Sequence, residues 1–187
     1  HPSRPLAFWI RYTTFSPNRH PENAIGELWA VCFDGETQQH VVVKQEIPFA
    51  QCEFKTQEFS VRIGDACLQP GRLNGSVHTA DQRISWNLTF CGDAEPLFLL
   101  PLNLYDAPLP KAKSLVGLPM AVFNGSLSVD GKEIDVANWV GSQNHHWGAK
   151  NTDLYAWGQV AGFDNHPDCV LEVATARLKI GPLWTPP

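Results

Sequence analysis

The sequence lacks both a concentrated basic surface and a long apolar run. It contains no cluster of Lys or Arg and carries a formal net charge of −5, whereas binding to nucleic-acid phosphates requires clustered positive charge. No window reaches the roughly 18 uninterrupted apolar residues that a transmembrane helix needs. The sequence therefore predicts neither a nucleic-acid partner nor a transmembrane segment.

Cysteine is sparse and unclustered. The five cysteines are widely spaced, odd in number and never form a Cys-x-x-Cys motif, which excludes a zinc knuckle and a dense disulfide framework. We expect reduced thiols, and these favour the cytoplasm of a bacterium. The periplasm is the alternative, because a chain that begins at His1 rather than Met leaves room for a preceding signal peptide.

Several common catalytic motifs are also missing. The absence of a Gly-x-Ser-x-Gly elbow, a phosphate-cradling loop and a dinucleotide fingerprint excludes the usual hydrolase, nucleotidase and dehydrogenase classes. His145 and His146 point to opposite faces if their segment is extended, and Asp153 is the only carboxylate near them in the sequence. We therefore predict no metal site and no cofactor.

Aromatic residues and two-residue periodicity are abundant. The 187 residues include seven Trp, ten Phe and three Tyr, which either fill a core or line an apolar pocket. Alternating β-branched and aromatic residues, separated by turn residues, predict an all-β barrel or sandwich in a single domain. The expected strands are Ala7 to Phe15, Gly26 to Phe33, Gln39 to Gln45, Glu58 to Ile63, Gly71 to Thr79, Arg83 to Phe90, Ala121 to Val129, Lys132 to Ala137, Asp153 to Phe163 and Cys169 to Ile180.

Three segments between these strands carry local signals. Asp130-Gly131 between alternating residues predicts a tight hairpin with positive φ at both positions. Glu95 to Pro119 contains five prolines and predicts a long connection, which either covers one end of a barrel or packs on its outside. Ala50 to Thr56 is expected to form one short helical turn at most.

The segment from Gly141 to Gly148, followed by Tyr155 to Gln159, concentrates imidazoles, amides and indoles. Such a mixture of donors, acceptors and a possible proton carrier favours a functional site. A glycine-bounded turn with His and Asn as turn residues explains the same composition. Both interpretations stay open from the sequence.

Strand alternation predicts which side chains share a face. Arg11 shares one with Trp9, and Glu27 shares one with Trp29, so an Arg11–Glu27 ion pair is one interpretation and two solvent-exposed side chains the other. The face of Tyr155, Trp157, Gln159, Ala161 and Phe163 suits a flat or elongated ligand, and it equally suits an aromatic core.

The segments Ala7 to Thr13, Gly26 to Ala30, Asn144 to Gly148 and Tyr155 to Gly158 resemble the AttH-like and CrtC-like lipocalin-related proteins, which include carotenoid hydratases (hydroxyneurosporene synthases). The resemblance implies a lipocalin-like, calycin-like antiparallel β-barrel over residues 1–187, with a cavity for an apolar substrate. It also implies the N-terminal half of a two-domain architecture, with Leu183 to Pro187 as the junction.

The family motif resembles Asp-His-x-Trp-Gly, and here Asn144 stands at its acidic position. An amide cannot release a proton as a carboxylic acid does. If this chain carries out such chemistry, His145 or His146 must therefore move the proton.

These observations give three hypotheses. The first is a binding module for a small apolar, isoprenoid-like or lipid-like molecule. The second is a cofactor-free hydratase, cyclase or isomerase of an unsaturated substrate with catalytic His145 and His146, and the third is a structural half-domain with a packed interior. Other partners are a second lipocalin-like domain or a homodimer. The expected ligand-binding residues are Trp9, Arg11, Glu27, Trp29, Gln143, Asn144, Trp147, Tyr155, Trp157 and Gln159.

Overall fold

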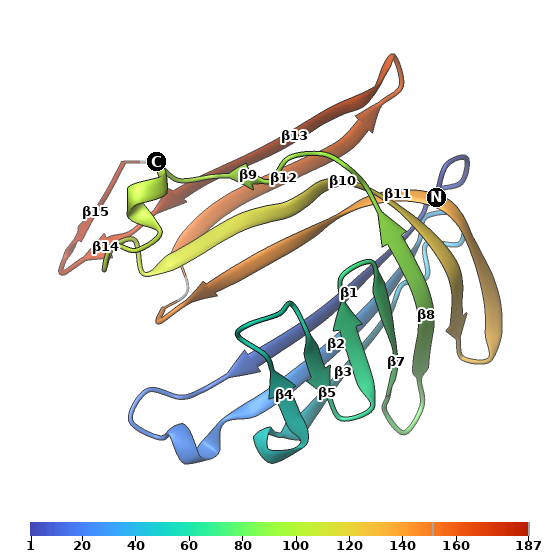
Figure 1. The fold of residues 1–187 in the computed structure, drawn as a ribbon, viewed down its shortest axis with the longest axis horizontal. Coiled ribbons are helices and arrows are strands. Elements are labelled where there is room, and N and C mark those ends of the chain that lie inside the picture. The colour runs from blue at the N-terminus through green and yellow to red at the C-terminus, as the bar shows by residue number, and fades with distance from the viewer. Residues whose placement is uncertain (151, 187) are drawn as a thin grey trace. The chain divides into compact units, whose positions relative to one another are not determined.

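The computed structural model describes residues 1–150 and 152–186, and their regular secondary structure consists almost entirely of antiparallel strands (Figure 1). The described chain has no α-helix, and its helical turns are the 3₁₀ segments Pro21–Asn23, Phe49–Gln51 and Leu102–Leu104. No helix of the described chain has the length and hydropathy needed to traverse a bilayer. The all-β prediction is confirmed.

The chain divides into two compact units. The first comprises His1–Cys91 and Phe123–Trp139, and the second comprises Gly92–Val122 and Val140–Pro187. The long strands β10 (Ala112–Val129) and β11 (Lys132–Gly148) contribute to both units. The assignment of residues 1–187 to a single domain stays a prediction.

The first unit is a curled, half-barrel-like assembly of antiparallel strands (Figure 1). One sheet has the order β1-β2-β3, and the other runs β11-β10-β8-β7-β6-β5-β4. The bounds are β1 (Leu6–Phe15), β2 (Ile25–Asp34), β3 (Val41–Pro48), β4 (Cys52–Phe54), β5 (Val61–Ile63), β6 (Ala66–Gln69), β7 (Arg72–His78) and β8 (Arg83–Cys91).

The hairpin between β10 and β11 turns at Asp130-Gly131. Both residues have positive φ, 50° and 82°, which matches the twist of the flanking strands. The Asp130 carboxylate also accepts a hydrogen bond from the backbone N–H of Arg83 at 2.7 Å. The predicted hairpin is confirmed.

Alternation along the strands builds the core of the first unit. On β1, Phe8 lies edge-on to Phe123 with ring centroids 5.4 Å apart, and Tyr12 lies edge-on to Trp86. The Tyr12 hydroxyl accepts a hydrogen bond from Trp86 Nε1 (2.9 Å) and shares its single proton between the carbonyl oxygens of Cys67 (3.0 Å) and Asn74 (3.1 Å). Burial raises the pKa of Tyr12. The largest fully buried aliphatic residues of this unit are Leu28, Val43, Ile63, Val77, Ile84, Leu88, Leu127 and Val136.

The second unit contains a two-stranded sheet of β12 (Leu154–Phe163) and β13 (His166–Arg177), together with β9 (Leu97–Phe98), β14 (Lys179–Ile180) and β15 (Leu183–Trp184). The β12–β13 register shifts between Ala161 and Phe163, where Gly162 has φ 79°. Regular alternation is therefore interrupted at Gly162, and the assignment of Phe163 to the face of Tyr155 and Trp157 stays a prediction.

Several predicted boundaries differ from the structure. The short strands β4, β6 and β9 were not predicted, and β10 begins at Ala112, inside the predicted connection Glu95 to Pro119. Strand β11 continues to Gly148, so the interpretation of Gly141 to Gly148 as a turn is wrong. The turn was inferred from the glycines at both ends of this segment. Glycine also occurs inside strands where another backbone approaches closely. The predicted junction includes Pro187, which lies outside the described residues.

Replacing Tyr12 with Phe is expected to lower the free energy of unfolding by about 1–3 kcal/mol, because the buried Trp86 N–H and two carbonyl oxygens lose a partner. Urea denaturation checks this expectation. The matched control is Tyr155→Phe, since Tyr155 is 73 % exposed. Equal unfolding free energies for the two variants would show that the Tyr12 hydroxyl does not support the core.

Candidate functional site

The end of β11 presents two sets of polar side chains to opposite faces. Gln143, His145 and Trp147 share one face, whereas Ser142 and Asn144 share the other, because successive strand residues alternate. Side-chain contacts confirm the division: His145 stacks on Trp147, and the Ser142 hydroxyl donates to Asn144 Oδ1 at 2.7 Å. The predicted site residues of this segment therefore form two separate groups.

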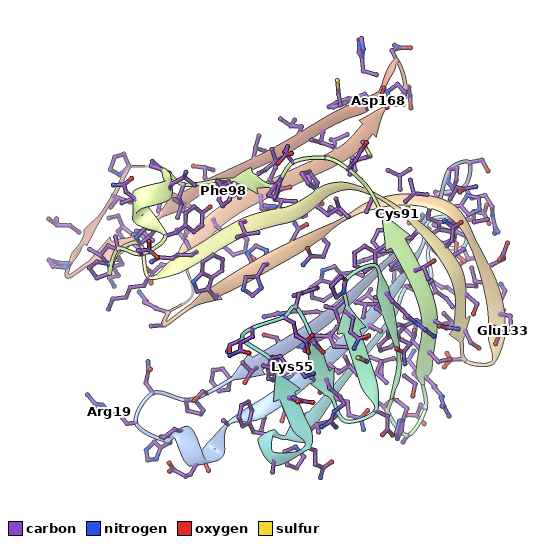
Figure 2. The ribbon with its side chains drawn as sticks, in the orientation of Figure 1. Arg19, Lys55, Cys91, Phe98, Glu133 and Asp168 are labelled. Carbon is purple, nitrogen blue, oxygen red and sulfur yellow. The ribbon has the colours of Figure 1, made fainter. Side chains whose placement is uncertain are left out.

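On the first face, three rings form an aromatic stack of His145, Trp147 and Tyr105. Ring centroids lie 5.0 Å apart for His145 and Trp147 and 5.8 Å apart for Trp147 and Tyr105. Phe98, labelled in Figure 2, lies edge-on to Tyr105 at 5.5 Å. The Tyr105 hydroxyl donates to the carbonyl oxygen of Ser114 at 2.8 Å. The proline-rich connection thus supplies a ring that the sequence analysis did not predict.

Burial within this stack lowers the pKa of His145, and the neighbouring His146 lowers it further. His145 is exposed to solvent as a whole, and one face of its ring stacks on Trp147. A lowered pKa leaves the imidazole neutral at pH 7. His145 is therefore suited to accept a proton or a hydrogen bond under neutral conditions.

Two glycines let backbone and side chains approach closely here. Gly148 has φ 152°, and a Cβ at this position would overlap the carbonyl oxygen of Lys111. The backbone N–H of Ala149 donates to the same carbonyl at 3.2 Å. A Cβ on Gly117 would lie 2.6 Å from Gln143 Oε1, so Gln143 covers this glycine of β10. The motif glycine is required by a close approach of strands, not by a turn.

On the second face, a polar chain links β11 to β12. Gln159 Nε2 donates to Ser142 Oγ at 2.6 Å, and Ser142 in turn donates to Asn144. Gln159 lies directly opposite Glu172 in the β12–β13 register. Glu172 Oε1 accepts a hydrogen bond from Trp157 Nε1 at 2.5 Å. We call these five residues, Ser142, Asn144, Trp157, Gln159 and Glu172, the polar cluster.

The polar cluster ends in groups with unused hydrogen-bonding capacity. Glu172 Oε2 is buried and has no hydrogen-bond partner among the described residues. Because Asn144 uses its carbonyl oxygen to accept from Ser142, its amide N–H groups remain to donate elsewhere. Tyr155 and Trp157, on the same face of β12, are 73 % and 50 % exposed. An open aromatic surface therefore adjoins a set of ordered polar groups.

The remaining predicted residues belong to the first unit. Trp9 is 45 % exposed, and Arg11 is also exposed. Glu27 pairs with Lys44 at 2.6 Å, and the Lys44 ammonium lies 5.0 Å from the centre of the Trp29 ring. The predicted Arg11–Glu27 ion pair is wrong, because Arg11 faces Trp29 in the β1–β2 register while Lys44 reaches Glu27 from β3.

Sequence reasoning missed Ser142, Glu172 and Tyr105. Glu172 lies in a segment recognised only as a strand, and its place opposite Gln159 follows from the register of the hairpin. Tyr105 lies among prolines, where periodicity gives no signal. Ser142 was within the motif, and its position two residues before Asn144 was the available signal, since i and i+2 share a strand face.

The described residues hold no group of three or more His, Cys, Asp or Glu side chains that could bind a metal ion. All five cysteines are free. Cys32 is buried, whereas Cys91 and Cys169 are exposed.

Comparison with known proteins identifies two similar sequences. The chain is 31 % identical over 114 residues to the uncharacterized proteins MT0513 and Rv0493c, each from a strain of Mycobacterium tuberculosis. The match covers 61 % of this chain and 32 % of each relative, so the chain spans about a third of the relatives' length. No family model and no solved structure matches the chain.

The lowered pKa of His145 makes stability depend on pH. The unfolded imidazole takes up a proton at a higher pH than the folded one, so the contribution of His145 to stability is complete above about pH 6.5 and falls as the pH drops towards the folded pKa. When the pH is lowered from about 7.5 to about 5, we expect the free energy of unfolding to fall less in His145→Gln than in the wild type. Urea denaturation at both pH values checks this. Parallel losses in the two proteins would contradict it.

Gly148→Ala is expected to lower the free energy of unfolding by about 1–3 kcal/mol, because the added methyl group overlaps the Lys111 carbonyl and φ 152° disfavours side chains. Gly158→Ala is the matched control, since its Cβ would lie at an ordinary 3.4 Å from Val173. Thermal unfolding of both variants checks the prediction, and an unaltered midpoint for Gly148→Ala would refute the close approach.

Proposed function

We propose that this protein binds a small, mainly apolar molecule with one polar end. The ligand lies on the exposed aromatic face of β12, and the polar cluster holds its polar end. The observation that carries the proposal is the adjacency of Tyr155 and Trp157 to Gln159, Ser142 and Asn144, which are already ordered by hydrogen bonds. Ligand sites typically combine apolar surface with a few fixed polar groups.

The chemistry of the polar cluster favours a hydroxyl or carbonyl end group. Asn144 offers N–H donors and Glu172 offers a carboxylate acceptor, so an alcohol satisfies both. The resemblance to AttH-like and CrtC-like lipocalin-related proteins supports an isoprenoid-like or lipid-like body. We further propose that the site belongs to a lipocalin-like barrel. The protein partner of this barrel is a second such domain or a second copy of the chain. The protein is located in the cytoplasm.

A cofactor-free hydratase, cyclase or isomerase is the second candidate. It is favoured by the neutral imidazole of His145, which is stacked on Trp147 and partly shielded from water. In this version His145 moves a proton to or from an unsaturated substrate, with His146 as the alternative. His145→Ala separates the two functions, because a binding module retains its ligand whereas an enzyme loses turnover.

Retinol, an apolar polyene with a single hydroxyl, is a suitable probe, and its binding is measured by titration of its fluorescence. Tyr155→Ala is expected to weaken binding because it removes exposed aromatic surface. Gln159→Leu is expected to weaken it about fivefold, the equivalent of one hydrogen bond of about 1 kcal/mol. Native mass spectrometry of the protein purified without detergent tests for a ligand that is already bound.

Trp184→Leu is the matched control, because Trp184 of β15 is 42 % exposed and contacts Lys179 of β14 and Arg177 at the end of β13, and none of these residues belongs to the polar cluster. The proposal predicts unchanged retinol affinity in this variant. A further Trp9→Leu variant shows whether the first unit contributes. The proposal is overturned if retinol, farnesol, a prenylated quinone and oleic acid all fail to bind and no molecule is released from the purified protein.

A further inference from the structure

A separate pocket lies beside Trp147 in the second unit. Its volume is about 280 Å³, and it is lined by Pro108, Pro110, Lys111, Lys113, Trp147, Gly148 and Ala149. We propose that this pocket binds a small aromatic monocarboxylate, with the carboxylate beside Lys111 and Lys113 and the ring against Trp147 and the two prolines. This inference does not depend on the proposed function, because Trp147 lies on the opposite face of β11 from Asn144.

The pocket has an ordered positive charge. Lys113 Nζ donates to the carbonyl oxygens of Tyr105 at 2.6 Å and Ala107 at 2.5 Å. An ammonium group has three donors, so one remains for a ligand. The two carbonyl oxygens hold the Lys113 ammonium group in place without neutralising its charge. The conformational entropy of this side chain is therefore lost on folding and not on ligand binding.

A second cation is available at the same site. Lys111 is exposed and, like Lys113, belongs to none of the ion pairs found in residues 1–150 and 152–186. Lys111 directly precedes β10 and Lys113 is the second residue of that strand, and both side chains line the pocket. The nearby Lys150, in contrast, is paired with Asp153 at 2.8 Å. The two lining lysines thus favour a single anionic group.

The rest of the lining selects an apolar, compact body. Trp147 and two proline rings supply flat apolar surface, and a volume of about 280 Å³ is just below the usual range of about 300–1,000 Å³ for ligand pockets. One or two fused rings suit this size better than a long acyl chain. Trp147 remains 38 % exposed, so part of the indole is accessible to a ligand.

The backbone around the pocket is held in place by its own contacts. The Lys111 carbonyl accepts the N–H of Ala149, and Gly148 permits the close approach. The ring of Tyr105 stacks on Trp147, while its hydroxyl is fixed to Ser114. Trp147 and the two lysines that line the pocket are therefore held in position by contacts around the same pair of strands, β10 and β11, as a preorganised site requires.

Isothermal titration calorimetry with 2-naphthoate, and with its neutral analogue 2-naphthamide, tests the proposal. We expect the acid to bind about tenfold more tightly than the amide, and Lys111→Gln to weaken acid binding about three- to tenfold. Lys150→Gln is the matched control, because Lys150 does not belong to the lining and is paired with Asp153. Its affinity for the acid should equal that of the wild type.

The proposal is overturned by any of the following results: no binding of 2-naphthoate, equal binding of acid and amide, or equal losses in Lys111→Gln and Lys150→Gln. Oleate binding more tightly than naphthoate would replace the aromatic acid with a fatty acid and would also overturn it. Tyr155→Ala and Gln159→Leu should leave naphthoate binding unchanged. Failure at this pocket is therefore distinguishable from failure of the proposed function.

Discussion

The alternation of side chains along the continuous strand β11 is the constraint on which the candidate sites depend. Because β11 pairs with β10 and remains extended to Gly148, Gln143, His145 and Trp147 lie on one face and Ser142 and Asn144 on the other. A turn in this segment would have allowed the imidazoles and amides to converge on one ligand. The extended strand separates them, so one motif supports two different chemical environments.

The two environments differ in what stabilises them. The aromatic stack depends on ring contacts of 5.0 Å and 5.8 Å and on a tyrosine from the proline-rich connection. The polar cluster depends on hydrogen bonds between β11 and the β12–β13 hairpin, with Gln159 as the link. A displacement of the β12–β13 hairpin would therefore break the hydrogen bonds of the polar cluster. It would leave the aromatic stack in place, because the stack depends on β10 and the segment before it.

The sequence predicted those features that local chemistry determines. The Asp130-Gly131 hairpin follows from two residues that tolerate positive φ, and most long strands follow from their two-residue period. The three-residue strands β4 and β5 are too short to show a period, and β4 was missed while β5 was extended too far towards its N-terminus.

The contacts of the site were less accessible to prediction. The partner of Glu27 is Lys44, two strands away from Arg11, and the neighbour of Gln159 is Glu172 on the following strand. Such pairs depend on the register between strands, and a shift of one residue would reverse every face. The sequence therefore identified Asn144, Trp157 and Gln159 as candidates but did not identify the serine and the carboxylate that complete their cluster.

The residue at position 144 bears on the choice between binding and proton transfer. The hydrogen bonds run from Gln159 to Ser142 and from Ser142 to Asn144 Oδ1, so the chain of donors ends at an amide whose N–H groups do not ionise. An aspartate there would accept the same bond from Ser142 but would end the chain in a carboxylate. With asparagine, this series of hydrogen bonds ends in a neutral amide, which can donate to a polar atom but cannot protonate a double bond. Among the ionisable side chains of the candidate site, Glu172 belongs to the polar cluster, whereas His145 lies on the other face of β11. The asparagine at position 144 therefore supports the proposed binding of a ligand more than its conversion.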